Sequence, residues 1–250
     1  TDVDGVFSAD PRAVPAARKL KTVTYDEMLE LAASGAKVLH LRCVEYARRY
    51  NLPIHVRSSF SPNEGTWVVE NHPEGGTMEQ AIISGVAHDK SEAKITIVGV
   101  PDRTGIAARI FQAIADNDIN VDMIVQNVSA AATGLTDISF TLPKAEGANG
   151  TAVLQRIQGE VGFASILYDD TIGKLSLIGA GMRSHPGVTA TFFAAMADSG
   201  VNIEMISTSE IRISIIVREA DLERATKAAH TAFQLDADQI EAVVYGGTGR

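Results

Sequence analysis

The sequence is poor in cysteine, in basic residues and in long apolar runs, and each shortage excludes a class of protein. Cys43 is the only cysteine, so neither an internal disulfide nor a cluster of thiolate metal ligands can form. No apolar run approaches the ~20 residues that a membrane-spanning helix needs, and no signal-peptide pattern opens the chain. Basic residues number 22 against 31 acidic ones, which disfavours nucleic acid and anionic membranes as partners. The sequence therefore predicts a cytoplasmic protein.

What is present fits an ordinary globular chain. Its 250 residues can bury a sizeable core, and 45% hydrophobic with 21% charged residues is a typical composition. The chain begins at Thr1 inside a patterned stretch, which leads us to expect an upstream portion.

An internal repeat organises the sequence. The stretch "ITIVGVPDRTGIAARIFQAIADNDINVDMI" is answered later by "LSLIGAGMRSHPGVTATFFAAMADSGVNIEMI". Gly105 and Asn120 recur as Gly187 and Asn202 at one common interval, and the extra residues of the second copy fall in a loop. A repeat whose insertion falls in a loop indicates a duplicated structural module.

Each copy has the pattern strand, helix, strand, strand, helix, strand. We expect strands at 94–100, 119–129, 136–142 and 163–169 in the first copy, and at 174–180, 201–207, 211–217 and 241–246 in the second. Apolar residues at helical spacing predict the intervening helices, the last of them at 221–233. This is the ferredoxin-like order, with helices on one face of an antiparallel sheet.

The region before the repeat has a different pattern of turn, helix, helix and strand. Thr24 and Glu27 have the spacing of a capping box, so a helix should begin there. A polar segment with Pro73, Gly75 and Gly76 follows and is typical of a linker. We expect an N-terminal part at 1–70, a linker at 71–80, a first module at 81–172 and a second at 173–250.

The repeated loop carries the chemistry. In each copy a glycine, Gly105 or Gly187, stands where a helix begins, and the free N–H groups of a helix start suit a carboxylate. An acid follows on the next strand, Asp122 or Glu204, and Asp102 lies in the first loop. Such a pattern matches an amino-acid zwitterion, with an acid accepting from its ammonium group. A structural reading stays open: the glycines simply start helices, and the acids face solvent.

The two repeats closely resemble the paired ACT modules of aspartokinase, and "SHPGVTA" with "ISTSEIRIS" is the most specific part. Two earlier segments resemble the second half of that family's amino-acid-kinase domain: the opening "TDVDGVFSADPR" and the later "KVLHLRCVEYARRYNLPIHVRSSF". Leu41 departs from the family pattern, which often has Pro there. The resemblance covers essentially the whole chain. It implies an α/β (α+β) fold of tandem ferredoxin-like βαββαβ ACT modules preceded by the C-terminal part of an amino-acid-kinase α/β domain.

The resemblance also implies an activity. The family transfers the γ-phosphate of ATP, with Mg²⁺, to L-aspartate, giving 4-phospho-L-aspartate and ADP on the route to lysine (through diaminopimelate), threonine and methionine. The residues that would bind ATP are Thr1, Asp2, Phe7, Ser8, Ala9, Asp10, Pro11, Arg12 and Lys37. Calcium at "DVDG" is a rival reading, but the glycine and glutamate spacing of an EF-hand is missing, so no metal site is predicted. The family's Lys-Phe-Gly-Gly phosphate loop occurs nowhere in the sequence. We therefore assign no catalytic residue and expect this chain alone to be inactive.

In the family, effectors bind between a first module and a second one, which usually comes from a partner chain. The resemblance therefore implies at least a homodimer, with association with full-length catalytic chains as a further option. It also implies threonine or lysine, or both, as effectors. The residues implied are Asp102, Arg103, Thr104, Gly105, Ile106, Ala107, Asn120, Val121, Asp122 and Gln126 of the first module, and Val188, Thr189, Asn202, Ile203, Ser209 and Glu210 of the second. The strand before the first module often joins the second module's sheet in the family. The alternative function is a stand-alone ACT-type amino-acid sensor, and Met78 is a candidate internal start for such a subunit. The segment Thr1–Arg12 favours the kinase reading.

Overall fold

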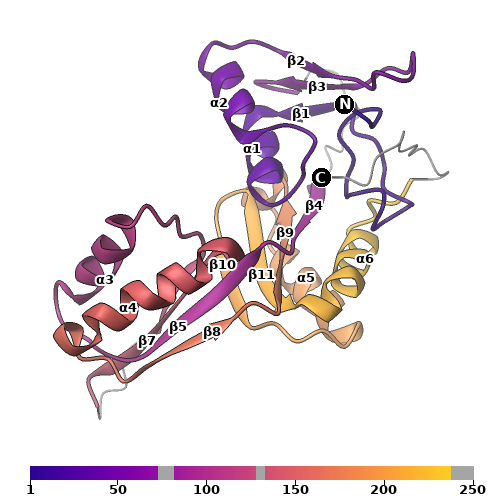
Figure 1. Cartoon of the computed structure of the whole chain (residues 1–250). Coiled ribbons are helices and arrows are strands. Elements are labelled where there is room, and N and C mark those ends of the chain that lie inside the picture. Colours follow the sequence, from indigo (N-terminus) through magenta and orange to yellow (C-terminus); the bar gives the residue numbers. More distant parts are fainter. Residues whose placement is uncertain (73–81, 128–132, 238–250) are drawn as a thin grey trace.

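The structure, a computed structural model, describes residues 1–72, 82–127 and 133–237. Three parts are visible, each built on its own β-sheet (Figure 1). The predicted linker lies almost entirely outside the described residues, as do Met78 and the strand predicted at 241–246. Within the described residues, no helix is both long and apolar enough to cross a membrane.

The N-terminal portion, residues 1–72, packs two helices against a small mixed sheet. Its elements are β1 (Thr22–Thr24), α1 (Tyr25–Ala33), α2 (Leu41–Arg49), β2 (Ile54–Val56) and β3 (Thr66–Val69). Strand β3 pairs with β1 in parallel and with β2 antiparallel. The predicted capping box is present: the Thr24 hydroxyl accepts from the N–H of Glu27, and the Glu27 carboxylate accepts from the N–H of Thr24 at 3.0 Å. The start of α1 is therefore confirmed, and its cap is a local one that sequence spacing can reveal.

The first module has the predicted ferredoxin-like order. Its elements are β5 (Glu92–Pro101), α3 (Ile106–Ala115), β6 (Ile124–Gln126), β7 (Leu135–Pro143), α4 (Gly147–Val161) and β8 (Ser165–Asp169). The sheet order is β6-β7-β5-β8, with every neighbouring pair antiparallel. Ile95 and Phe140 of the sheet pack with Ile110 of α3 and Leu154 of α4, because both helices cover the same face (Figure 1).

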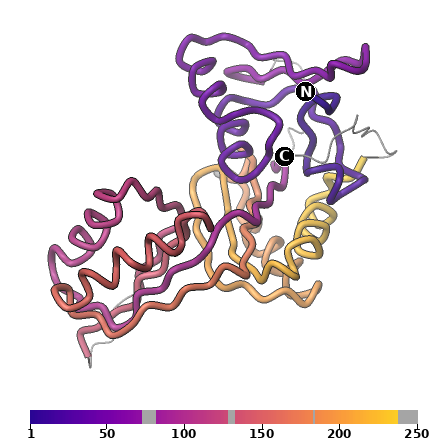
Figure 2. The backbone as a smooth tube through the Cα atoms, viewed as in Figure 1, coloured from indigo at the N-terminus to yellow at the C-terminus, as the bar shows by residue number. Residues whose placement is uncertain are grey.

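The second module has the same arrangement, except that its fourth strand comes from a segment that precedes the first module in sequence. Its elements are β9 (Ile172–Ile178), α5 (Val188–Asp198), β10 (Met205–Thr208), β11 (Arg212–Arg218), α6 (Leu222–Ala232) and β4 (Gly85–Asp89). The sheet order is β10-β11-β9-β4. Strand β4 precedes the first module in sequence, yet it pairs antiparallel with β9 and takes the edge where a ferredoxin-like unit has its fourth strand. The backbone trace thus leaves the second sheet for the first module and returns (Figure 2).

Strands β6 and β10 are shorter than the sequence pattern predicts. Residues 128–129 of the segment predicted at 119–129 lie outside the described residues, and the rest joins the ladder regularly only from Ile124. Just before it, the N–H of Asp122 donates to the carbonyl of Thr141, whose own N–H donates to the carbonyl of Met123, so that two residues face one. This is the pattern of a β-bulge, which interrupts regular pairing. In the second copy regular pairing likewise begins at Met205.

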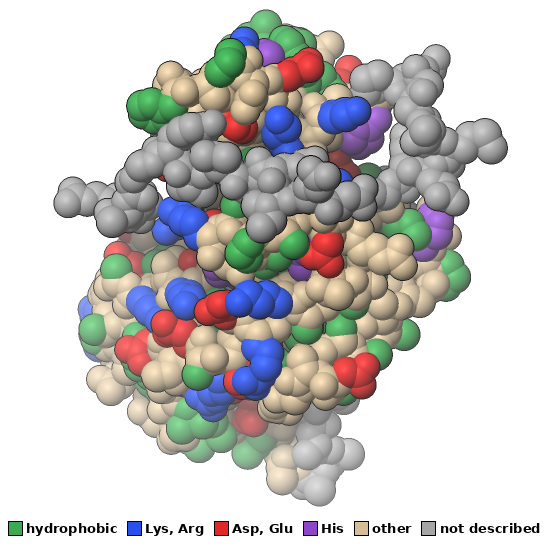
Figure 3. Space-filling model, turned by 90° about the vertical axis from the view of Figure 1, so that its right-hand side faces the viewer, with side chains coloured by type: hydrophobic (Ala, Val, Ile, Leu, Met, Phe, Trp, Pro, Cys, Tyr) green, Lys and Arg blue, Asp and Glu red, His purple; other side chains and the backbone are tan. Residues whose placement is uncertain are grey.

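The two modules meet along their sheets. Met123 and Val125 of the first copy pack with Met205, Ile172 and Ile216 of the second in a small separate core. Elsewhere the surface carries acidic and basic side chains interspersed, as the face that includes α6 shows (Figure 3). Two ion pairs on and beside α6 are examples: Arg224 contacts Asp221, which precedes the helix, and Lys227 contacts Glu223, each at 2.6 Å.

Candidate functional site

A cavity of about 450 Å³ lies between the N-terminal loop, residues 1–12, and strand β4; we refer to it as the loop cavity. The predicted nucleotide residues that line it are Thr1, Asp2, Phe7, Ala9, Asp10, Pro11, Arg12 and Lys37. Val3, Val6 and Val38 add apolar surface. A concave site with apolar walls and a few charged groups is the usual form of a small-molecule pocket.

The loop holds its own charges in place. The guanidinium of Arg12 donates from both Nε and an Nη atom to the carboxylate of Asp10, each at 3.0 Å, and the N–H of Arg12 donates to the same carboxylate at 2.9 Å. Burial by itself would raise the pKa of Asp10, but these contacts with Arg12 hold it below its ordinary value. Arg12 is thus a positioned cation whose charge is largely balanced within the loop.

Ser8, also predicted to bind nucleotide, does not line the loop cavity. Its hydroxyl is fully buried and lies 2.8 Å from Nε2 of His230, a residue of α6 in the second module. Nδ1 of His230 in turn lies 3.0 Å from the carboxylate of Asp236. The N–H of Arg18 donates to the Ser8 hydroxyl at 2.8 Å. Ser8 therefore ties the loop to the second module instead of facing a ligand.

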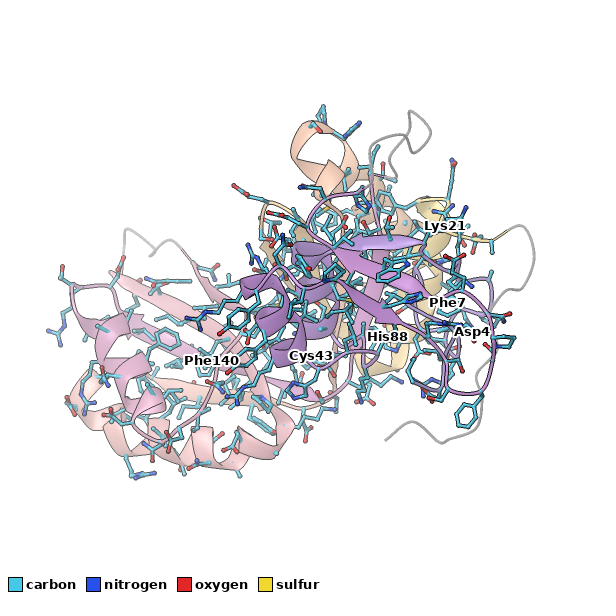
Figure 4. The ribbon with its side chains drawn as sticks, turned by 90° about the horizontal axis from the view of Figure 1, so that it is seen from above. Asp4, Phe7, Lys21, Cys43, His88 and Phe140 are labelled. Carbon is cyan, nitrogen blue, oxygen red and sulfur yellow. The ribbon has the colours of Figure 1, made fainter. Side chains whose placement is uncertain are left out.

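Strand β4 forms the opposite wall, and sequence reasoning missed it. The residues that it and the following turn contribute are Val86, Ala87, His88, Asp89, Lys90 and Ser91. Phe7 of the loop and His88 of β4 lie near each other in the view from above (Figure 4). The stretch "SGVAHDK" predicts a strand, but nothing in its pattern specifies which part of the chain it faces.

The residues predicted to bind an effector fall on two surfaces. The first effector wall is the turn after β5 with the start of α3, together with the approach to β6: Asp102, Arg103, Thr104, Gly105, Ile106, Ala107, Asn120, Val121, Asp122 and Gln126. Gly105 caps α3 with φ of 92°, a left-handed conformation that glycine adopts at little cost. No side chain caps this helix start. The N–H of Ile106 donates to the carbonyl of Arg103 at 3.3 Å, and no side chain of the described residues accepts from the N–H groups of the helix start.

The second effector wall comes from the second module: Val188, Thr189, Asn202, Ile203, Ser209 and Glu210. Gly187 has a φ of 106° and caps α5 as Gly105 caps α3. Ser209 and Glu210 lie in the turn between β10 and β11, where the N–H of Ser209 donates to the carbonyl of Arg212 at 2.8 Å. The two walls thus reproduce the duplication, one on each sheet.

The repeated acids are engaged inside the chain. The carboxylate of Asp122 accepts from Nζ of Lys174, on β9, at 2.7 Å, and Glu92 contacts the same ammonium group. In the reciprocal arrangement, Glu204 of the second copy contacts Lys94 of the first. Burial alone would lower the pKa of Lys174, whose side chain is 1% exposed, but the two carboxylates raise it above its ordinary value. The repeated acids therefore join the two modules, a role that the repeat itself did not reveal.

Two family models match the chain. The model described as the ACT domain matches residues 95–157 and 175–233, and the model of the amino acid kinase family matches residues 1–58. The matched segments correspond to the two modules and to the N-terminal portion that holds the loop cavity.

Individual relatives agree with these matches. An aspartokinase of Mycolicibacterium smegmatis is 59% identical over 250 residues, which cover 100% of this chain and 59% of that protein. A solved structure of aspartokinase alpha and beta subunits shares 46% identity and a TM-score of 0.57, covering 60% of this chain and 98% of the other. E. coli aspartokinase III, solved in complex with lysine and aspartate, shares 26% identity and a TM-score of 0.71, covering 94% of this chain and 51% of the other. The chain thus spans 59% of the length of the curated relative that it matches.

Proposed function

This chain belongs to the aspartokinase family, and from that premise we propose that it carries the nucleotide loop and the regulatory modules of an aspartate kinase. The complete enzyme would transfer the γ-phosphate of ATP to the β-carboxylate of L-aspartate, giving 4-phospho-L-aspartate and ADP. That reaction would begin the synthesis of lysine, threonine and methionine in the cytoplasm. The division of the chain at 1–70, 71–80, 81–172 and 173–250 is part of this proposal.

The observation that supports a nucleotide site is the loop cavity. All the residues that the family resemblance implies for ATP line it, except Ser8. Phe7 and the apolar residues Val3 and Val38 suit the flat face of a base, and Lys37 offers an ammonium group to phosphate. The carboxylate of Asp10 already balances the charge of Arg12. Of these two cations, Lys37 is therefore the more effective one for binding phosphate.

Mg²⁺ would enter with ATP. Magnesium in phosphoryl transfer is held chiefly by the phosphate oxygens and one or two carboxylates. Among the described residues, no cluster of three or more His, Cys, Asp or Glu side chains could hold a metal ion. We therefore assign no residue of this chain to the ion, which would neutralise charge on the transferred phosphate in the complete enzyme.

Turnover tests this proposal. Supplied with ATP and aspartate, the chain alone should form no aspartyl phosphate above background, because the phosphate loop of the family is not in its sequence. Joining it to the N-terminal part of the M. smegmatis relative should give turnover, and Lys37→Ala in that enzyme should reduce it. Turnover by the chain alone, or none in the joined enzyme, would contradict the proposal.

The regulatory part of the proposal concerns a small α-amino acid, with threonine and lysine as the candidates. Its carboxylate would bind the N–H groups at the start of α3, near Gly105 and Ile106. Its ammonium group would bind an acid of the first effector wall, and the second effector wall would close over it from a partner chain. The relative solved with lysine supports this ligand class. Calorimetric titration with threonine and with lysine tests it, and heat from neither would remove the feedback hypothesis.

A second candidate is a regulatory subunit without catalysis of its own. The alignment with 98% of a chain from the alpha and beta subunit structure favours it, because that chain matches only 60% of this one. Internal initiation at Met78 would produce such a subunit. Expression of the intact gene should then yield a shorter product beside the full-length one, and a single full-length band would argue against it.

A further inference from the structure

The loop cavity has walls from two parts of the molecule. One is the N-terminal loop together with Lys37; the other is β4 and the turn that follows it. Strand β4 belongs to the second module's sheet, since it pairs with β9 from Gly85 opposite Ile178 to Asp89 opposite Lys174. A strand of the regulatory sheet therefore lies against the cavity in which we propose that nucleotide binds.

Close backbone contacts fix this strand against the N-terminal portion. The N–H of Val86 donates to the carbonyl of Ser8 at 2.7 Å. A Cβ atom at Gly85 would lie 2.9 Å from that carbonyl oxygen, and one at Gly35 would lie 2.3 Å from the carbonyl oxygen of His88. Only glycine permits both approaches, so β4 packs closely against the N-terminal portion.

The charges around the cavity single out one side chain of this wall. Arg12 is bound by Asp10, and the carboxylate of Asp89 accepts from the N–H and hydroxyl of Ser91 at 2.8 and 2.7 Å. Lys37 and Lys90, in contrast, have no ion-pair partner within 4.0 Å among the described residues. The cavity therefore carries one uncommitted ammonium group on each of its two walls.

The neighbours of Lys90 do not take over its role. His88 lies two residues before it, on β4, and burial lowers the pKa of that imidazole, which disfavours its charged form. Glu223 of α6 lines a smaller recess together with Lys90, but its carboxylate is bound to Lys227 at 2.6 Å. Lys90 is thus the lysine of the β4 wall, and it has no ion pair within 4.0 Å in the part of the chain that the structure describes.

We propose that Lys90 binds the phosphate chain of the nucleotide in the loop cavity, so that the regulatory sheet supplies a side chain to the nucleotide site. An ammonium group with three donors is well suited to phosphate oxygens. The inference rests on the proposed function, because it requires nucleotide in this cavity. It adds a direct route for regulation: any change in the position of β9 moves β4 and, with it, a phosphate contact.

Nucleotide binding to the full 250-residue chain tests the proposal. Calorimetry would compare ATP and adenosine for the unaltered chain, Lys90→Ala, Lys90→Arg and Lys37→Ala, with Lys21→Ala as the control for loss of an exposed lysine remote from the cavity. We expect Lys90→Ala to weaken ATP binding about tenfold and adenosine binding not at all, as a charge-assisted contact to phosphate requires. Lys90→Arg should restore most of the loss, and unchanged thermal midpoints would show intact folding.

The outcomes distinguish failure of the Lys90 contact from failure of the nucleotide site. If Lys37→Ala weakens ATP binding while Lys90→Ala matches Lys21→Ala, the Lys90 contact is wrong and the nucleotide site stands. Equal losses for ATP and adenosine in Lys90→Ala would also overturn the phosphate contact. If the unaltered chain binds neither ligand, the nucleotide site in this cavity is wrong, and the Lys90 contact with it.

Discussion

At the scale of single residues, two histidines contact the N-terminal portion, and their pKa values are shifted in opposite directions. His230 is fully buried between Ser8 and Asp236, and burial holds its pKa below the ordinary value, against the opposing effect of Asp236. Nε2 of His72 lies 3.3 Å from the carboxylate of Glu27, and that contact raises the pKa of His72. The two imidazoles must therefore affect stability with opposite dependence on pH.

The sign follows from linkage. His230 with its lowered pKa contributes stability above 6.5, its unfolded value, and loses it as pH falls further, since the unfolded chain protonates first. His72 with its raised pKa contributes below 6.5 and loses its contribution as pH rises through the raised value. His230→Gln should therefore destabilise more at pH ~8 than at pH ~6, and His72→Gln the reverse. Urea unfolding at both pH values measures this, and a common pH trend for the two variants would contradict it.

Glu27 is a second residue whose environment sets its charge. Burial alone would raise its pKa, but hydrogen bonds from His72, Ser84 and Thr24 lower that pKa to about 2. The N–H of Ala180, in the turn that follows β9, also donates to its carboxylate at 3.3 Å. Glu27 thus ties α1 to the second module.

Replacing Glu27 by Gln should reduce the free energy of unfolding at pH 7 by about 1–3 kcal/mol, the usual loss when a buried charged acceptor is removed. The depressed pKa makes this contribution present above 4.5, its unfolded value, and lost as pH falls toward about 2. The exposed Glu45→Gln on α2 is the matched control. If both variants unfold alike at pH 7, Glu27 has no special role.

At the scale of elements, the turn after β5 and the approach to β6 divide two tasks between two acids. The carboxylate of Asp122 is bound to Lys174, whereas that of Asp102 has no hydrogen bond or ion pair with any described residue. Either acid could have accepted from an effector ammonium on sequence grounds. The contacts favour Asp102 for the ligand and Asp122 for joining the modules.

If the two acids divide the tasks in this way, replacing one should affect effector binding and replacing the other should affect stability. Asp102→Asn should lower affinity for threonine or lysine about tenfold to a hundredfold, the value of a charge-assisted hydrogen bond, and leave the thermal midpoint unchanged. Asp122→Asn should lower the thermal midpoint, because Lys174 would keep Glu92 as its only carboxylate. Calorimetry and thermal unfolding of both variants decide it. The opposite pattern would return Asp122 to the effector site.

The sequence revealed local features and missed distant ones. Spacing alone predicted the capping box of Thr24 and Glu27, as well as the order of each module, because both depend on neighbours in sequence. The family resemblance, and not periodicity, implied that the strand before the first module joins the second module's sheet, and β4 does pair with β9. The contacts of Asp122 depend on side chains far apart in the chain, and neither periodicity nor the repeat carries that information. Duplication alone also does not tell why a residue is repeated, since a repeated acid can bind a ligand or join two modules equally well.

At the scale of the whole molecule, the edges of both sheets carry exposed apolar residues. Ile124 on β6 is 48% exposed, Ile206 on β10 is 43% exposed and Leu167 on β8 is 59% exposed. Edge strands with apolar side chains favour pairing with another chain. We therefore predict at least a dimer at micromolar concentration with effector present, measured by light scattering. A strictly monomeric mass would contradict the shared effector pocket.

Strand β4 thus lines the cavity in which we propose that nucleotide binds and also belongs to the sheet of the second module, in which we propose that an amino acid binds. The most direct test is to titrate the chain with ATP in the absence and presence of saturating threonine or lysine. The account predicts that one of these amino acids binds and changes ATP affinity about fivefold or more, with the reciprocal change in its own affinity. Identical ATP affinity with and without each bound amino acid would contradict it.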